Sequence, residues 1–260
     1  MPKFAANLGF LFNEVPFLDR FAAAAQAGFH AVEFPFPYDY GPAELAAQLR
    51  SHGLQLVLFN APPGDASAGE RGIAALPGRA TEFRAAIELA LAYARGTGCR
   101  QIHVMAGLIP AGRSREEVEA IYVDNLRHAA DVFARDEIRL LIEPLNLRDN
   151  PGYILSTTAQ AIGLLDRVGA ANVALQLDLY HCQVTEGDLA GHIHRLLPRT
   201  GHIQIAGNPG RNEPDRGEIN YPFLFDLLDR LGYDGWIGCE YRPAEATLAG
   251  LRWAARWGVG

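Results

Sequence analysis

The chain alternates between short apolar runs and longer stretches in which apolar positions recur every three or four residues. The short runs are rich in Val, Ile, Leu and Phe, as buried parallel strands are, and the longer stretches are rich in Ala and have the period of a helix. The pattern predicts eight strands, over residues 4–10, 31–34, 54–60, 101–105, 139–143, 173–179, 202–206 and 236–241. It predicts eight helices, over residues 16–27, 42–51, 80–97, 114–134, 158–168, 188–197, 223–231 and 244–256.

Residues at the helix ends agree with this pattern. Glycine follows several helical stretches, where it adopts a left-handed conformation without strain. These glycines are Gly28, Gly53, Gly98, Gly169 and Gly232. Ser114 stands at the start of a helical stretch that has Glu116 and Glu117 in its first turn, as an N-cap does. Eight strands and eight helices in 260 residues predict a closed (β/α)8 TIM barrel. An open doubly wound sheet is the alternative, which is disfavoured because no G-x-G-x-x-G motif follows the first strand.

Composition favours one large domain. The chain is 49% hydrophobic and 20% charged, which is enough apolar surface for a full core. Its 27 Gly and 16 Pro residues are spread along the whole length and mark no linker, so residues 1–260 are expected to form a single domain. The three cysteines, Cys99, Cys182 and Cys239, are far apart and odd in number, so neither a disulfide framework nor a cysteine-based zinc site is expected.

Charge and hydropathy exclude several classes of partner. The net charge is −7 and no run of Lys or Arg occurs, so nucleic acid and anionic membranes are not expected as partners. The single lysine, Lys3, lies at the N-terminus, which argues against Schiff-base aldolases and pyridoxal enzymes, since both need a lysine in the site. The chain opens without a signal-peptide pattern and has no run of about 18 apolar residues. A cytoplasmic protein is therefore expected.

Four polar residues stand at corresponding places near the ends of the last four predicted strands, which read RLLIEP, ALQLDLYH, HIQIAG and WIGCEYR. They are Glu143, Asp178, Gln204 and Glu240. In a TIM barrel the carboxyl ends of the strands carry the active site, and three carboxylates gathered there would repel one another without a cation. The all-oxygen ligand set favours Mg²⁺ or Mn²⁺ over Zn²⁺. The alternative for each residue alone is a strand-end side chain that meets solvent or caps the next helix.

Further polar residues follow the same strands. His181 comes three residues after Asp178, and Arg211 lies in the loop that follows Gln204. Arg211 is suited to pair bidentately with a substrate carboxylate, and a solvated loop arginine is the alternative. For His181 the alternative is a locally hydrogen-bonded histidine. Less strongly indicated residues that could face the same mouth are Asn7, Glu33 and His103.

These motifs carry a family resemblance over nearly the whole chain. The segments FAANLGFLFNEVPFLDRF, GFHAVEFPFPYDY, LVLFNAPPGD, IEPLN, LQLDLYHCQ and GHIQIAGNPGRNEP resemble the hydroxypyruvate isomerase family, a branch of the xylose-isomerase-like TIM barrels. The resemblance implies a divalent metal on Glu143, Asp178, Gln204 and Glu240, with Glu143 and Glu240 as the acid/base pair. Related ketose 3-epimerases carry a histidine in place of Gln204 and hold substrate with residues that match His181 and Arg211.

The expected activity is metal-dependent interconversion of hydroxypyruvate and tartronate semialdehyde by proton transfer through an enediolate. The alternatives are a 2-oxo-tetronate isomerase, which the family also resembles, and a ketose 3-epimerase. A metal-dependent endonuclease is disfavoured by the acidic charge, and a catalytically silent barrel that binds a sugar acid is the alternative outside enzymes. Trp253 and Trp257 are expected to pack on the barrel, with a subunit contact as the alternative, so the sequence is compatible with a homo-oligomer.

Overall fold

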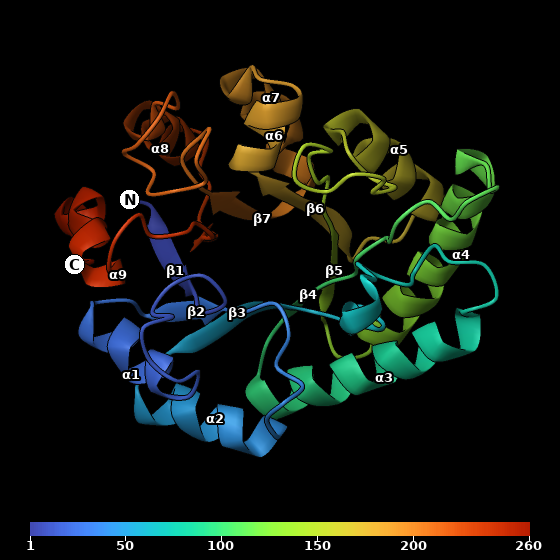
Figure 1. The fold of residues 1–260 in the computed structure, drawn as a ribbon, viewed down its shortest axis with the longest axis horizontal. Helices are drawn as coiled ribbons and strands as arrows, with labels where there is room; N and C mark the ends of the chain where they lie inside the picture. The colour runs from blue at the N-terminus through green and yellow to red at the C-terminus, as the bar shows by residue number, and fades with distance from the viewer.

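Eight parallel strands close into a barrel in chain order in the computed structural model, which describes residues 1–260 (Figure 1). The strands are β1 (Lys3–Asn7), β2 (Ala31–Glu33), β3 (Gln55–Asn60), β4 (Gln101–His103), β5 (Arg139–Ile142), β6 (Val173–Asp178), β7 (Thr200–Ile205) and β8 (Trp236–Cys239). The barrel is sealed by pairing of β1 with β8. The predicted (β/α)8 TIM barrel is confirmed, and the open doubly wound sheet is excluded.

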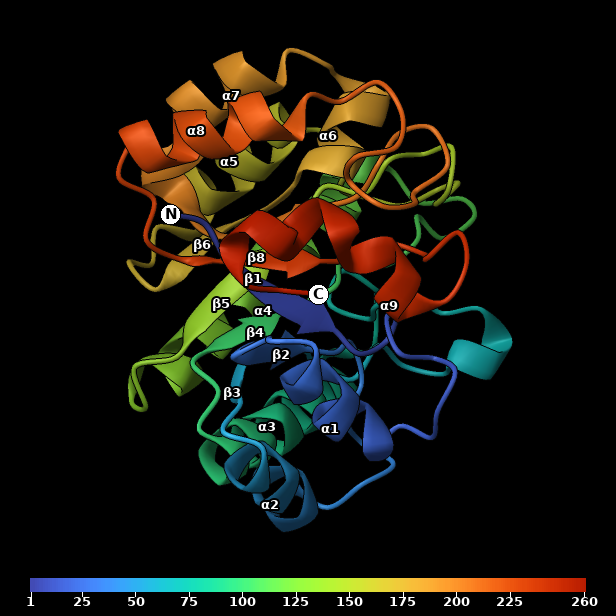
Figure 2. The same ribbon diagram turned by 90° about the vertical axis from the view of Figure 1, so that its left-hand side faces the viewer.

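Helices surround the barrel on the outside (Figure 2). They are α1 (Asp19–Gln26), α2 (Pro42–Ser51), α3 (Ala80–Thr97), α4 (Arg115–Ala134), α5 (Thr158–Val168), α6 (Leu179–Thr185), α7 (Leu189–Leu196), α8 (Tyr221–Arg230) and α9 (Thr247–Gly250). Short 3-10 helices occupy Ala66–Ala68, Leu197–Arg199 and Leu251–Trp257. Ser114 caps α4 as predicted, because its side chain accepts a hydrogen bond from the Glu117 N–H.

Two segments differ from the prediction. The sixth strand ends at Asp178, and α6 begins at once, because the Asp178 carboxylate accepts the Tyr180 N–H and so starts a helix where a loop was expected. The predicted helix over residues 244–256 is a short α9 followed by a 3-10 helix. Gly250 lies at the junction and is a weak helix former. After it, Trp253 and Trp257 pack edge-on against Phe4 of β1, which agrees with the predicted packing on the barrel.

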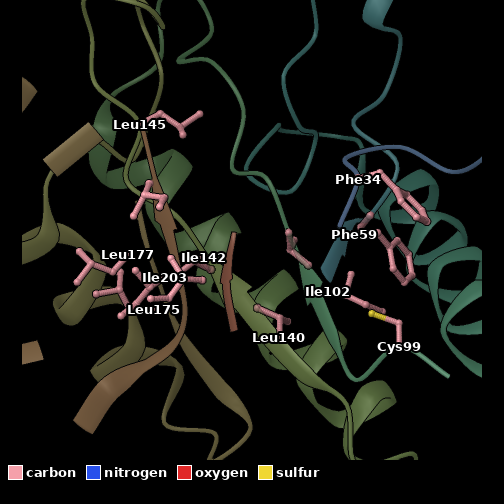
Figure 3. Close-up of a cluster of buried hydrophobic side chains, with 14 of the residues drawn as sticks. Phe34, Phe59, Cys99, Ile102, Leu140, Ile142, Leu145, Leu175, Leu177 and Ile203 are labelled. Atoms are coloured by element: carbon pink, nitrogen blue, oxygen red, sulfur yellow. The ribbon is translucent and has the colours of Figure 1, made fainter. Parts of the chain in front are cut away.

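Strand alternation divides the buried side chains between two sides of the barrel wall. Ile142, Leu175, Leu177 and Ile203, from three neighbouring strands, gather in one cluster (Figure 3). A smaller cluster of Ala5, Ala31, Val57, Leu58 and Leu141 fills part of the other side. Residues two apart on a strand share a face, so the face that carries Leu141 in β5 continues to Glu143. No helix is long and apolar enough to cross a bilayer.

Candidate active site

Side chains on the inner face of the strands become polar toward the carboxyl ends. Ala5 and Leu141 belong to the small apolar cluster, and two residues further along their strands stand Asn7 and Glu143. A cavity of about 240 Å³ opens at this level, and both polar side chains line it. A cavity of this size suits a small metabolite, because pockets for drug-sized ligands are larger. A larger hollow at the opposite end of the barrel is lined by residues from the strand starts and holds no comparable cluster of buried carboxylates.

The six residues predicted for the site all lie at this end of the barrel. Their places are Glu143 just after β5, Asp178 at the end of β6, His181 in α6, Gln204 in β7, Arg211 in the loop after β7, and Glu240 just after β8. Five of them line the cavity, and the sixth, Asp178, is buried beside it within 3.5 Å of Arg211. The structure therefore brings together residues that are nearly 100 positions apart.

Glu143, Asp178 and His181 form a close group of potential metal ligands at the cavity. Their ligand atoms lie within 4.8 Å of one another, and all three side chains are buried. The Oε1 atom of Glu143 has no hydrogen-bond partner. Because burying an unpaired carboxylate oxygen is costly, a proton or a cation is expected to meet it. Glu143 and Asp178 therefore fit a divalent cation, and the imidazole of His181 lies beside the place where they would hold it.

Gln204 faces the carboxylates with its amide nitrogen. Its Nε2 donates to Glu240 Oε2 and, at 2.7 Å, to Glu33 Oε1, while its Oε1 accepts a hydrogen bond of 2.6 Å from Gln176. A cation needs the amide oxygen, so ligation by Gln204 requires its amide to turn over. Gln176 must turn with it to keep a hydrogen bond between the two, and its Oε1 has no partner in the present orientation.

His181 is held in one tautomer beside Asp178. Its Nδ1 accepts a hydrogen bond of 3.2 Å from the backbone N–H of Asn146, so the proton of the neutral ring is on Nε2. That atom lies 3.6 Å from Asp178 Oδ2. Burial lowers the pKa of His181 to about 4, which keeps the ring neutral in the ordinary pH range. The residue lies on a helix, not at the start of a loop as the sequence suggested, because Asp178 starts α6.

Arg211 carries the one permanent positive charge on the cavity wall. Its guanidinium lies 5.1 Å from the centre of the Phe10 ring and 5.0 Å from that of Tyr180. Its Nη2 donates to Glu240 Oε1 at 2.6 Å. The backbone of Arg211 has a φ of 54°, a left-handed conformation that costs free energy for a residue with a Cβ. The surrounding contacts therefore hold this side chain in the site against backbone strain, unlike the solvated loop arginine of the alternative.

A buried polar network forms the floor of the cavity around Glu33. This carboxylate accepts a hydrogen bond of 2.9 Å from Asn7 Nδ2 and lies 2.6 Å from His202 Nε2. Asn7 Nδ2 also donates to Glu240, at 3.1 Å, and so links the floor to the predicted base. Opposite Glu33, a Cβ on residue 238 would lie 2.4 Å from both carboxylate oxygens. Gly238 is therefore the residue that lets this carboxylate reach β8.

Burial and mutual repulsion set the protonation of the two glutamates. Burial raises the pKa of Glu143 well above its ordinary value, and the nearby charges of Glu240 and Asp178 raise it further. Burial also raises the pKa of Glu240 to about 8, although Arg211 opposes the shift. A raised pKa makes a carboxylate a stronger base, which suits both glutamates to accept and return protons during a reaction.

The site includes three residues that the sequence analysis does not predict, Asn146, Gln176 and His202. Gln176 and His202 stand two positions before Asp178 and Gln204, so period-two alternation would place them on the same inner face. Asn146, in the IEPLN segment, orients His181 through a contact of 2.6 Å between its Nδ2 and the ring Nδ1. The weaker candidates Asn7, Glu33 and His103 all line the cavity.

Comparisons with known proteins agree with this geometry. A family model described as a xylose isomerase-like TIM barrel matches residues 21–257. The chain belongs to the xylose isomerase-like TIM barrel family. Within this family, a 2-oxo-tetronate isomerase of Cupriavidus necator is 56% identical over 97% of each chain. A hydroxypyruvate isomerase of Escherichia coli is 49% identical over 97% of this chain and 98% of the relative. The prediction that this chain is an enzyme of the isomerase type is confirmed by such relatives.

Solved structures extend the comparison. A protein of Brucella melitensis described as a family 2 AP endonuclease has 50% sequence identity and a TM-score of 0.97, covering 99% of this chain and 100% of its own. An L-ribulose 3-epimerase has a TM-score of 0.76 at 20% identity, covering 98% of this chain and 86% of its own, and shares the fold alone. Proteins with this barrel thus carry different described activities, so the substrate must be argued from the site.

Proposed function

We propose that this protein is a metal-dependent isomerase that interconverts hydroxypyruvate and tartronate semialdehyde. The observation that carries the proposal is the pair Glu143 and Glu240, two buried carboxyl groups with raised pKa values on the wall of one small cavity. Binding alone does not need two such groups, whereas moving a proton between adjacent carbons needs one to accept it and one to donate it.

The reaction moves two protons, and the two glutamates can carry the one that is bound to carbon. The reaction removes a proton from C3 of hydroxypyruvate and adds one to C2, and the hydroxyl proton on O3 is replaced by one on O2. One of the two glutamates takes the carbon-bound proton, and the other delivers a proton to the neighbouring carbon. A divalent cation, Mg²⁺ or Mn²⁺, supplies a Lewis acid that stabilises the enediolate when it is bound. Glu143 and Asp178 would hold the cation, and the family resemblance adds Gln204 and Glu240.

Arg211 is proposed to receive the substrate carboxylate. It is the one arginine on the cavity wall, and no lysine reaches the cavity. His181 stands beside it as a neutral donor for a substrate oxygen. The narrow cavity with one internal cation, Arg211, supports a small anionic substrate, and the acidic net charge of −7 does not favour nucleic acid. We expect the protein to act in the cytoplasm.

A second candidate is the isomerisation of a 2-oxo-tetronate, a four-carbon sugar acid. The 56% identical relative with that name favours it. The reacting carbons are the same in both acids, because the four-carbon substrate differs only by a hydroxymethyl group on C3. The same glutamates and the same arginine would therefore serve either substrate.

The test is a substrate panel with chelator-treated protein. Hydroxypyruvate and 2-oxo-tetronate should be turned over after Mg²⁺ or Mn²⁺ is restored, while a neutral ketose should be turned over slowly or not at all. Glu143→Gln and Glu240→Gln should each lower kcat by roughly 100-fold or more, because the amide cannot accept the proton. Exposed Glu116 provides the control, since Glu116→Gln should leave kcat unchanged. Full activity in protein that elemental analysis shows to be metal-free would contradict the proposal.

A further inference from the structure

His103 is a fully buried imidazole on the cavity wall for which the reaction described above has no use. It is the last residue of β4 and is 1% exposed, and neither of its ring nitrogens has a hydrogen-bond partner. The nearest charged group is Glu143, whose Oε2 lies 3.6 Å from the ring Nδ1, beyond hydrogen-bond distance. Buried polar groups are nearly always paired, so an unpaired imidazole beside a cavity indicates a ligand atom that pairs with it.

Asn60 supplies a second neutral polar group next to His103. The two residues are direct partners in the register between β3 and β4, and both line the cavity. The side chain of Asn60 makes one hydrogen bond within the protein, a weak one of 3.9 Å from Nδ2 to the sulfur of Met105. Its amide is therefore free to donate to and accept from a ligand in the cavity.

The place of this pair in the barrel decides which part of a substrate it meets. In a closed barrel of eight strands, β3 and β4 stand across from β7 and β8, where Glu240 and the Arg211 loop lie. A substrate whose carboxylate pairs with Arg211 and whose reacting carbons meet Glu143 and Glu240 therefore points its far end toward β3 and β4. The imidazole of His103 and the amide of Asn60 are neutral, and each can donate and accept a hydrogen bond. They are therefore suited to bind a hydroxyl group at that end of the substrate, not a second carboxylate.

We propose that His103, together with Asn60, binds the hydroxymethyl group that a four-carbon 2-oxo acid carries beyond its reacting carbons, and so sets the chain length that the enzyme prefers. The inference rests on the proposed function, because it takes the orientation of the substrate from Arg211 and the two glutamates. Hydroxypyruvate has no atom to place against the pair. Its turnover should therefore depend little on either residue, whereas the four-carbon acid should lose a buried hydrogen bond when the pair is altered.

The first experiment compares kcat/KM for 2-oxo-tetronate and hydroxypyruvate in His103→Leu. We expect a loss of about 10- to 100-fold for the four-carbon acid and less than about threefold for hydroxypyruvate. His103→Gln, which keeps one donor and one acceptor, should recover part of the loss. Leu58→Met is the matched control, because Leu58 lines the same cavity from the strand of Asn60 and has no hydrogen-bonding side chain, so the ratio of the two kcat/KM values should stay within about twofold.

The second experiment measures binding without turnover. Calorimetry compares threonate with glycerate, a four-carbon and a three-carbon hydroxy acid that lack the ketone. Wild type should bind threonate more tightly, and the difference should shrink in His103→Leu and in Asn60→Leu. If a Leu variant fails to fold, as judged by its melting curve, His103→Gln and Leu58→Met still provide the comparison.

The outcomes separate the two proposals. Equal losses of kcat/KM on both acids in His103→Leu would show that His103 acts through Glu143 and does not contact the substrate. That result would overturn this inference and leave the isomerase proposal intact. A wild type that turns over hydroxypyruvate alone and binds threonate no better than glycerate would also overturn it. A wild type that turns over neither acid would overturn the proposed function itself.

Discussion

The conformation of single residues carries much of the site's chemistry. Arg211 has a left-handed backbone, and its guanidinium lies about 5 Å from the ring centres of Phe10 and Tyr180 and donates to Glu240. These contacts hold the guanidinium in place before a ligand binds, so less side-chain conformational entropy is lost on binding. Sequence could name this residue from its place after the seventh strand. It could not supply its strain or its aromatic neighbours, because both depend on the path of a loop.

Arg211→Lys should lower kcat/KM for hydroxypyruvate by about 10- to 100-fold, because an ammonium group cannot reproduce the bidentate pairing or the flat contact with the rings. A neutral ketose, if it is turned over, should lose far less. Arg216→Lys is the control, since Arg216 belongs to the same loop and has 57% of its side chain exposed. Steady-state kinetics on both substrates checks this. Equal losses on both would show that Arg211 shapes the loop and does not read the carboxylate.

At the scale of elements, hydrophobic period predicted the architecture well and the strand ends less well. All eight strands were found, but all except β3 stop one to three residues before their predicted ends; β5 and β8, for example, end before Glu143 and Glu240. The alternation rule also placed the candidate carboxylates on one face. It could not show α6, since a hydrogen bond from one aspartate starts that helix, nor the amide orientation of Gln204, which depends on Gln176.

Gly238→Ala should destabilise the fold, because the added methyl group would meet both oxygens of Glu33 at 2.4 Å inside the closed barrel. Overpacking of this kind costs about 1–3 kcal/mol, and displacing a buried carboxylate from His202 adds to it. Denaturant unfolding at equilibrium measures the loss. The matched change Gly163→Ala, in the interior of α5 with open space around it, should leave stability equal or raise it by about 0.5–1 kcal/mol. Equal stability of the two variants would refute the close contact.

For the whole molecule, the buried titratable groups couple folding to pH and to metal. Glu143 and Glu240 have raised pKa values in the folded state, so the folded state binds more protons than the unfolded state above about pH 4.5, up to about pH 8 for Glu240. Burial lowers the pKa values of His103 and His181 to about 3 and about 4, which has the opposite effect below about pH 6.5. The two effects offset each other in acid, and only the glutamates remain above pH 6.5.

Chelator-treated protein should therefore lose stability as the pH rises from about 6.5 to about 8, by up to about 1.4 kcal/mol per pH unit for each glutamate. Mg²⁺ competes with those protons, so it should raise the melting temperature more at pH 8 than at pH 6. Glu240→Gln removes one titrating group and should flatten the pH dependence. Thermal denaturation across this range with and without Mg²⁺ measures both effects. A flat profile for the metal-free wild type would show that the glutamates titrate as exposed groups do.

The hydrogen bond from Asn7 to Glu240 joins residues that are 233 positions apart, across the seam where β1 meets β8. During synthesis the first strand leaves the ribosome long before the last. Until β8 is made, the floor of the cavity lacks Glu240, and Glu33 lacks the strand that packs against it at Gly238. A chain cut short just before the eighth strand would keep most of its core residues but would lack Glu240 and the closed barrel. The active site is thus a feature of the finished chain, and catalytic activity reports directly that the two ends have met.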